Sequence, residues 1–143
     1  WCVRAHAAGL VGYYIPDVVV QHLIPQDRLT KSYFRRWYYW RGVSRAILYA
    51  DCGLDMENPE GPPPDLARVR HIAGVPRYMF RTALGHLKEA VGARLVGDRV
   101  RSFDADLWLS FYAGIVRRRS RDRRAAVLTA GHAVAAVTTP QSA

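Results

Sequence analysis

A run of prolines and glycines near the middle of the sequence sets the strongest limit on how this chain can fold. It ends in Gly61 followed by three consecutive prolines at positions 62–64. Proline lacks the amide hydrogen that helices and sheets use, and several prolines in a row favour an extended spacer. We therefore expect residues 51–64 to be a linker between an N-terminal unit, residues 1–50, and a helical unit, residues 65–124.

The segment that follows Thr30 carries the clearest helical pattern, and it continues to about residue 50. Threonine is a residue type that caps the N-terminus of a helix. Gly42 in its middle is expected to cost about 1 kcal/mol relative to alanine. The pattern predicts an amphipathic helix with an aromatic inner side and a basic outer side. The inner arc consists of Tyr33, Trp37, Trp40, Ser44, Ile47 and Leu48, and the basic arc of Lys31, Arg35, Arg41 and Arg45.

Two short apolar runs before this helix are typical of β-strands. Residues 11–15 include two tyrosines, and residues 18–24 begin with three consecutive valines, which are residue types enriched in strands. The Pro-Asp pair at positions 16–17 between them is a turn signal. Residues 1–8 are typical of the end of a helix, with Gly9 as its C-terminal cap. The N-terminal unit is thus expected to hold a helix end and two strands.

Two helices are expected at the start of the unit that follows the linker. Residues 65–72 are a short helix candidate, and the glycine at position 74 punctuates the chain after it. Pro76 suits the first position of a longer helix, which is expected to run to about residue 95. The side chains predicted to face the core from this longer helix are Met79, Ala83, Leu87, Ala90 and Val91.

A last helix is expected after the break at Gly97 and Asp98. It begins at Ser102 or Asp104 and ends near residue 118. Little pattern remains farther on, so residues 125–143 are expected to form a tail without regular structure. The side chains predicted to face inward are Leu107, Trp108, Phe111 and Ile115.

The overall charge indicates attraction to polyanions. The chain has 21 Lys and Arg against 12 Asp and Glu, for a formal net charge of +9. Such a balance suits nucleic acid, anionic lipid surfaces or substrates that carry a diphosphate. The two cysteines form no CxxC motif, which favours free thiols in a reducing compartment over a disulfide. No apolar run reaches the 18 or more residues of a transmembrane helix.

Several short motifs follow one another in a fixed order within residues 1–48. An aromatic-x-x-Arg-x-x-x-x-Gly pattern opens the chain at Trp1, and a Pro-Asp turn, a valine-rich run and a histidine follow at 16–22. An Arg-Leu-Thr segment at 28–30 then precedes the aromatic, basic helix that contains Gly42. This order resembles the C-terminal part of family 2 glycosyltransferases, which have the GT-A fold.

The resemblance implies an α+β fold that is mostly helical. Two short N-terminal strands would form the edge of a GT-A-type sheet, followed by the amphipathic helix and a helical C-terminal extension. The catalytic carboxylates, a Glu-Asp pair and an Asp-x-Asp motif, would lie upstream of Trp1, so that no catalytic residue falls within this chain. The parent enzyme would move a sugar from a nucleotide-diphosphate donor to a polysaccharide, lipid-linked or protein-linked acceptor.

The resemblance also implies roles for residues that follow the second strand. Transfer leaves a diphosphate whose charge must be stabilised by a divalent cation or by cationic side chains. His22 is the expected metal ligand, for Mn²⁺ or Mg²⁺, although a histidine bonded to backbone at a strand end is the alternative. Arg28, Lys31 and Arg35 are candidate diphosphate contacts or, alternatively, a solvated helix face. Trp37 is a candidate for stacking on sugar or lipid or, alternatively, part of the core.

The basic run at residues 117–124 leaves two interpretations open. It suits either anionic lipid headgroups or a solvated helix end, where cations are favoured. A cytoplasmic chain, peripheral at the inner face of the membrane, is the expectation, without a nucleic-acid partner. Two other functions remain as alternatives. One is a basic nucleic-acid-binding module, for which no helix-turn-helix, zinc or RNP motif is present, and the other is a non-catalytic membrane-surface adaptor.

Overall fold

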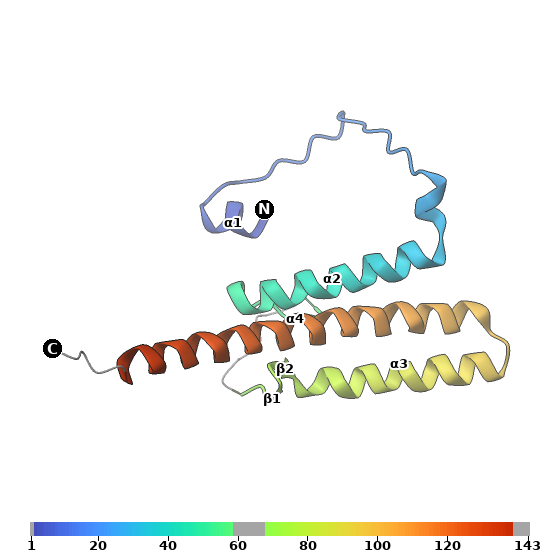
Figure 1. Cartoon of the computed structure of the whole chain (residues 1–143). Coiled ribbons are helices and arrows are strands. Elements are labelled where there is room, and N and C mark those ends of the chain that lie inside the picture. The colour runs from blue at the N-terminus through green and yellow to red at the C-terminus, as the bar shows by residue number, and fades with distance from the viewer. Residues whose placement is uncertain (1, 59–67, 139–143) are drawn as a thin grey trace.

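The chain is α+β and mostly helical, with three long helices forming its body. The computed structural model describes residues 2–58 and 68–138, with side-chain surroundings for residues 5–58 and 68–126. The long helices are α2 (Lys31–Cys52), α3 (Arg77–Leu95) and α4 (Arg99–Thr138). The shorter elements are the helix α1 (Cys2–Ala7), the 3-10 turn η1 (Gln26–Leu29), and the strands β1 (His71–Ile72) and β2 (Val75–Pro76). α4 lies between α2 and α3 (Figure 1) and packs against both.

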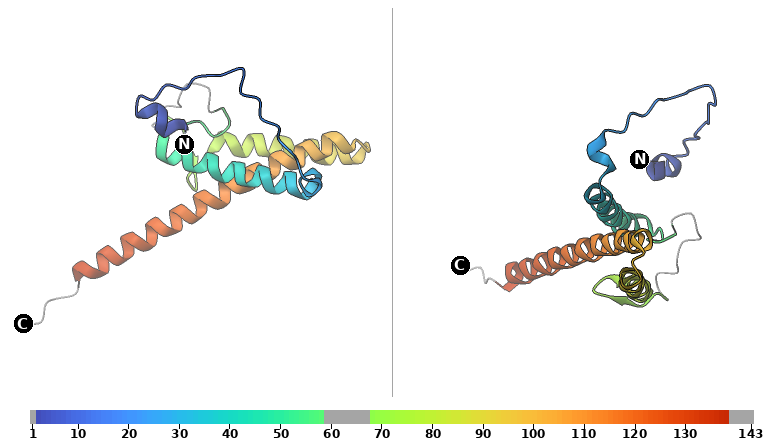
Figure 2. Two further views of the ribbon diagram at one scale, coloured as in Figure 1. Left: turned by 90° about the horizontal axis from the view of Figure 1, so that it is seen from above. Right: turned by 90° about the vertical axis from the view of Figure 1, so that its right-hand side faces the viewer.

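The two strands predicted at residues 11–15 and 18–24 do not form. Residues 10–25 contain neither helix nor strand, and they arch away from the long helices (Figure 2). Their apolar side chains stand in solvent, and Tyr14, for example, is 90% exposed. A strand needs a neighbour for its backbone N–H and C=O groups. The one sheet of the described residues is the β1–β2 hairpin, far along the chain, so these segments have no strand to pair with.

The hairpin replaces the helix predicted over residues 65–72. Residues 65–67 lie outside the described part of the chain, and residues 68–70 are not helical. β1 and β2 pair antiparallel across a two-residue turn in which Ala73 and Gly74 have φ of 52° and 79°. Two successive residues with positive φ match the right-handed twist of a tight hairpin. The turn therefore favours a hairpin over the predicted helix. Its Gly74 carbonyl accepts a hydrogen bond of 2.9 Å from Arg119 Nε, which ties the hairpin to α4.

Helix α2 begins where predicted but turns a different face inward. Thr30 Oγ1 accepts a hydrogen bond from the Tyr33 N–H at 3.2 Å, which confirms the N-cap. The buried residues of α2 are Gly42, Ala46 and Tyr49, whereas Trp37 and Trp40 are 49% and 58% exposed. The predicted aromatic inner arc is therefore wrong, because α2 approaches α4 most closely at Gly42, where a larger side chain would not fit.

Glycines on both helices allow this close approach. A Cβ placed on Gly42 would overlap the Phe111 carbonyl oxygen of α4, and one on Gly114 would overlap the Tyr39 carbonyl oxygen of α2. The two backbones are thus in direct contact at the crossing. Gly42 has a packing role that outweighs its low helix propensity.

Helix α3 confirms its predicted bounds, but only part of its predicted core face. Pro76 immediately precedes it, and Gly97, with φ of 75°, follows its end. Met79 and Ala90 are buried as expected, and Ala83 is partly buried against the same core. Leu87 and Val91 are instead 47% and 48% exposed. α4 covers a narrower arc of α3 than the apolar pattern suggests.

Helix α4 is longer than predicted at both ends. Asp98 Oδ1 accepts a hydrogen bond of 3.0 Å from the Arg101 N–H, so the helix starts at Arg99 rather than at Ser102 or Asp104. It continues past the expected end to Thr138, so that residues 125–138 are helical and residues 139–143 lie outside the described part. Of its predicted core residues, Leu107, Phe111 and Ile115 are buried, and Trp108 packs against the core with partial exposure.

The segment after α2 is held against the helices by tyrosines. Gly53, with φ of 67°, follows Cys52, the last residue of α2. Residues 53–58 have no regular structure, as expected for the linker. The rest of the predicted linker, residues 59–64, lies outside the described part. Met56 is fully buried in the core. Tyr78 donates a hydrogen bond to Asp55 Oδ2, and Tyr112 donates one to Glu57 Oε1, both at 2.8 Å. Residues 53–58 are thereby fixed to α3 and α4.

Partial or full burial of these phenols changes how readily they ionise: Tyr112 is 6% exposed and Tyr78 is 37% exposed. The pKa of the Tyr78 hydroxyl is raised from 10.0, first by burial and then by its hydrogen bond to the Asp55 carboxylate. Burial and the hydrogen bond to Glu57 raise the pKa of Tyr112 in the same way. Burial also raises the pKa of Tyr49, whose hydroxyl is hydrogen-bonded to His71 Nε2. All three phenols thus stay protonated at neutral pH.

Candidate functional site

The chain folds back over the start of α2 just before that helix begins. Pro25 precedes η1, and the Arg28 N–H donates to the Pro25 carbonyl at 3.0 Å. The Thr30 hydroxyl donates to the Asp27 carbonyl at 3.1 Å, which ties η1 to the helix cap. The extended backbone before Pro25 is therefore directed along the first turns of α2, and it brings His22 close to that helix.

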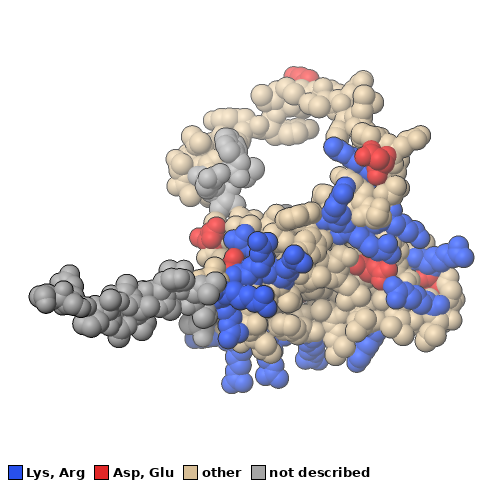
Figure 3. All heavy atoms as spheres, in the orientation of Figure 1, with Lys and Arg blue, Asp and Glu red and all other residues tan. Residues whose placement is uncertain are grey.

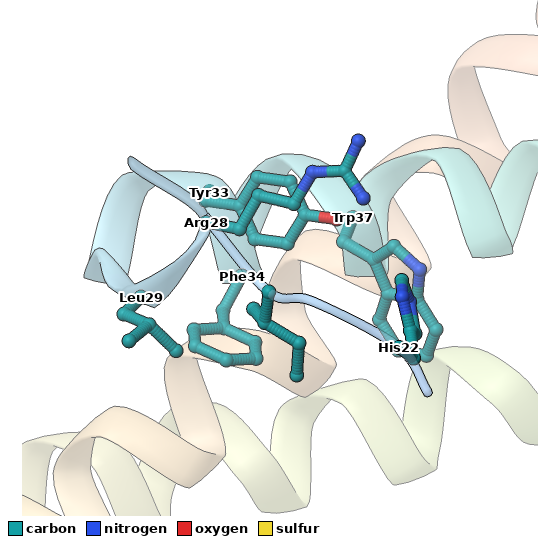
Figure 4. Close-up of a pocket in the computed structure, with 7 residues that line it drawn as sticks. His22, Arg28, Leu29, Tyr33, Phe34 and Trp37 are labelled. Carbon is teal, nitrogen blue, oxygen red and sulfur yellow. The ribbon is translucent and has the colours of Figure 1, made fainter. Parts of the chain in front are cut away.

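A hollow of about 240 Å³ lies between this segment and α2 (Figure 4). Three of the five predicted site residues, His22, Arg28 and Trp37, contribute to its lining. His22 and Trp37, which are 15 positions apart in the sequence, thus lie at the same hollow. The complete lining consists of His22, Ile24, Arg28, Leu29, Tyr33, Phe34 and Trp37.

The hollow combines an apolar floor with a few polar groups. Leu29, Phe34 and Trp37 give it hydrocarbon and aromatic surface, whereas His22 and Arg28 bring an imidazole and a guanidinium. A guanidinium group can donate two parallel hydrogen bonds to two oxygens of one phosphate. A flat aromatic face suits a sugar ring or an acyl chain. This arrangement suits a ligand that has an anionic end and a less polar body.

Lys31 and Arg35 do not line the hollow. Both lie over the Phe103 ring of α4, with the Lys31 Nζ and the Arg35 guanidinium carbon 5.4 and 5.3 Å from its centroid. Arg35 Nη2 also lies 3.1 Å from Asp106 Oδ2, whose other oxygen lies 2.6 Å from Arg94 Nη2. These two predicted substrate contacts therefore face α4, and Arg35 helps to join α2 to α3 and α4.

The donor set of the hollow does not by itself suit a divalent cation. His22 is accompanied by Arg28, whose positive charge repels metal ions, and the described residues contain no group of three His, Cys, Asp or Glu side chains close enough to hold one. Mn²⁺ and Mg²⁺ prefer several oxygen ligands. A cation at His22 would thus need carboxylates from outside the described residues.

Sequence reasoning missed the apolar part of the lining. Ile24, Leu29 and Phe34 were assigned no role, yet they form the floor of the hollow. Phe34 and Trp37 lie three positions apart, so a helical wheel places them on one side of α2. That spacing was the available signal, but only the fold-back of η1 brings Ile24 and Leu29 to the same side.

Comparison with models of known protein families, with curated proteins and with solved structures gives no match to this chain. Among the described residues, none of the helices combines the length and the apolar character needed to cross a membrane.

Proposed function

We propose that this chain is the C-terminal part of a family 2 glycosyltransferase that moves a sugar from a nucleotide-diphosphate donor to a glycan, lipid-linked or protein acceptor. The observation that carries the proposal is the meeting of His22, Arg28 and Trp37 in one hollow. The resemblance implies a metal ligand at His22, a diphosphate contact at Arg28 and a stacking surface at Trp37. In the parent enzyme the guanidinium would contact the diphosphate, and Trp37 would contact the less polar body of the donor or acceptor.

The exposed segment before the hollow supports the same proposal. Val19, Val20 and Leu23 are 80% or more exposed, although their residue types favour buried strands. Contiguous apolar surface of this kind marks a contact with something else. The remaining strands of a GT-A sheet, supplied by upstream sequence, would give residues 11–15 and 18–24 the partners that a sheet edge needs.

A divalent cation, Mn²⁺ or Mg²⁺, would supply positive charge to the leaving diphosphate in the proposed enzyme, provided that upstream carboxylates complete its ligands. His22 would contribute one ligand, and the carboxylates of the expected Asp-x-Asp and Glu-Asp motifs would contribute the others. Within this chain, Arg28 would add positive charge near the same oxygens and orient them. The carboxylate that accepts the proton of the acceptor hydroxyl would also come from upstream sequence.

The test is an activity assay on the intact protein that carries this chain. Release of nucleoside diphosphate is measured with a panel of UDP-, GDP- and dTDP-sugars, with Mn²⁺, with Mg²⁺ and with a chelator. We expect release with at least one donor, dependence on the metal, and a loss of at least tenfold in His22→Ala. His6→Ala, on the exposed α1, is the matched control and should keep full activity. No release from any donor would refute the proposal.

A further inference from the structure

A second hollow, of about 340 Å³, lies between α2 and α4 beside their crossing. We call it the basic groove. α2 contributes Tyr39, Trp40 and Val43 to it, and α4 contributes Arg117, Arg118 and Arg121. Figure 3 shows a dense group of Lys and Arg side chains in this part of the molecule, where α4 leaves the other helices. The groove therefore joins an aromatic wall to a strongly cationic one.

The charges in the basic groove are only partly compensated. Arg118 Nε lies 2.9 Å from Asp122 Oδ1, and the same carboxylate is 3.8 Å from Arg119 Nη1. Arg117 and Arg121, in contrast, make neither an ion pair nor a hydrogen bond within the described residues. They lie four positions apart, one helical turn, so their charges repel each other. An anion bound between them would relieve this repulsion.

The aromatic wall defines what else the ligand must carry. Trp40, more than half exposed, offers an indole beside the guanidinium groups. Indole rings favour the boundary between polar headgroups and hydrocarbon, where one side is apolar and the other wet. The groove therefore suits a phosphate whose organic part can lie against the indole.

We propose that the basic groove binds the phosphate group of an anionic phospholipid headgroup, with Arg117 and Arg121 on its oxygens and Trp40 beside the glycerol region. A free phosphate compound would present the same anionic group, but the course of α4 favours the lipid. From the groove the helix continues away from the bundle to Thr138 (Figure 2), and residues 125–138 contain no Asp, Glu, Lys or Arg. This inference does not depend on the proposed glycosyltransferase function.

The experiment measures binding of the whole chain to vesicles by co-sedimentation. The vesicles are pure phosphatidylcholine or phosphatidylcholine with one quarter phosphatidylglycerol, at low and at physiological salt, because screening weakens exposed charge contacts. The test variant is Arg117→Gln with Arg121→Gln. The matched control is Arg123→Gln with Arg124→Gln, which removes the same charge from exposed positions of α4 that do not line the groove. Circular dichroism checks that both variants keep their helices.

We expect binding to the anionic vesicles alone, reduced at least fivefold in the test variant and less than twofold in the control. Trp40→Leu should also weaken it, because the interfacial ring is lost. A second arm measures inorganic pyrophosphate binding by calorimetry. Pyrophosphate binding without vesicle binding would overturn the lipid as the source. Equal losses in the test and control variants, or binding to neutral and anionic vesicles alike, would overturn the groove as the site.

Discussion

Gly42 of α2 lies against the backbone carbonyl of Phe111 in α4, so closely that a Cβ on Gly42 would overlap that oxygen. We expect Gly42→Ala to lower the free energy of unfolding by about 1–3 kcal/mol, because two packed backbones must move apart. Urea denaturation measures this change. The control is Gly85→Ala in α3, where an added Cβ meets nothing within 4 Å. It should instead stabilise the chain by about 1 kcal/mol, and a loss of stability at Gly42 no larger than at Gly85 would contradict the close crossing.

Asp106 joins three helices, because its two oxygens face Arg35 of α2 and Arg94 of α3. Both arginines are about half exposed, so water can solvate them when the carboxylate is lost, and the cost of Asp106→Asn should stay near 1 kcal/mol. The loss should shrink at high salt, where ion pairs are screened. Asp104→Asn, at an exposed position two residues earlier, is the control and should be near neutral. Equal effects of the two substitutions would show that the joining role is absent.

The hydrogen-bonded phenols of Tyr78 and Tyr112 predict a loss of stability at alkaline pH. Tyr78 and Tyr112 have a raised pKa in the folded chain, so above pH 10 the unfolded chain releases protons that the folded chain still holds. Stability contributed by these groups is therefore complete below about pH 10 and falls as pH rises further. Thermal unfolding between pH 8 and 11 measures the slope.

Tyr112→Phe separates this ionisation from other alkaline effects. The variant loses its hydrogen bond to Glu57 and should be less stable at pH 8 by about 1 kcal/mol. Its stability should also fall less steeply above pH 10, because one titrating group is gone. Tyr13→Phe, at a side chain that is 86% exposed, is the control. A slope in Tyr112→Phe as steep as in the control would contradict the raised pKa.

The sequence predicts the start of α2 and both ends of α3 better than it predicts which faces of these helices are buried, for a physical reason. Thr30, Pro76 and Gly97 act through their own backbone and neighbouring amides, so the start of α2 and both ends of α3 could be placed from local chemistry. The inner face of α2 depends instead on what packs against it. Gly42 and Ala46 are buried in place of larger apolar residues because α4 approaches α2 at these positions. No property of the α2 sequence alone reveals where α4 approaches.

The same distinction applies to the strands and to the candidate site. Residues 11–15 and 18–24 have strand composition, but pairing is a property of two segments and the second is missing from the described chain. His22, Arg28 and Trp37, three of the five site residues that the sequence predicts, meet in one hollow. Lys31 and Arg35 were grouped with them by nearness in sequence, and the helical turn carries both toward Phe103 instead.

Thr30 links the stability of α2 to the shape of the hollow. Its hydroxyl oxygen accepts from the Tyr33 N–H and donates to the Asp27 carbonyl, so one side chain caps α2 and holds η1. We expect Thr30→Ala to cost about 1 kcal/mol of stability. The amide of Tyr33 should then exchange its hydrogen several times faster, since about 1.4 kcal/mol corresponds to a tenfold change in an equilibrium constant.

Thr30→Ser keeps the hydroxyl and should restore slow exchange at Tyr33, which distinguishes the cap from simple loss of side-chain volume. Ser44→Ala, at an exposed position farther along α2, is the second control and should leave the exchange of Tyr33 near that of the unchanged chain. If Thr30→Ala also speeds exchange at Arg28, whose amide is bonded within η1, then the floor of the hollow depends on the cap. Faster exchange at Tyr33 alone would confine the role of Thr30 to α2, and unchanged exchange at both amides would contradict the capping contact.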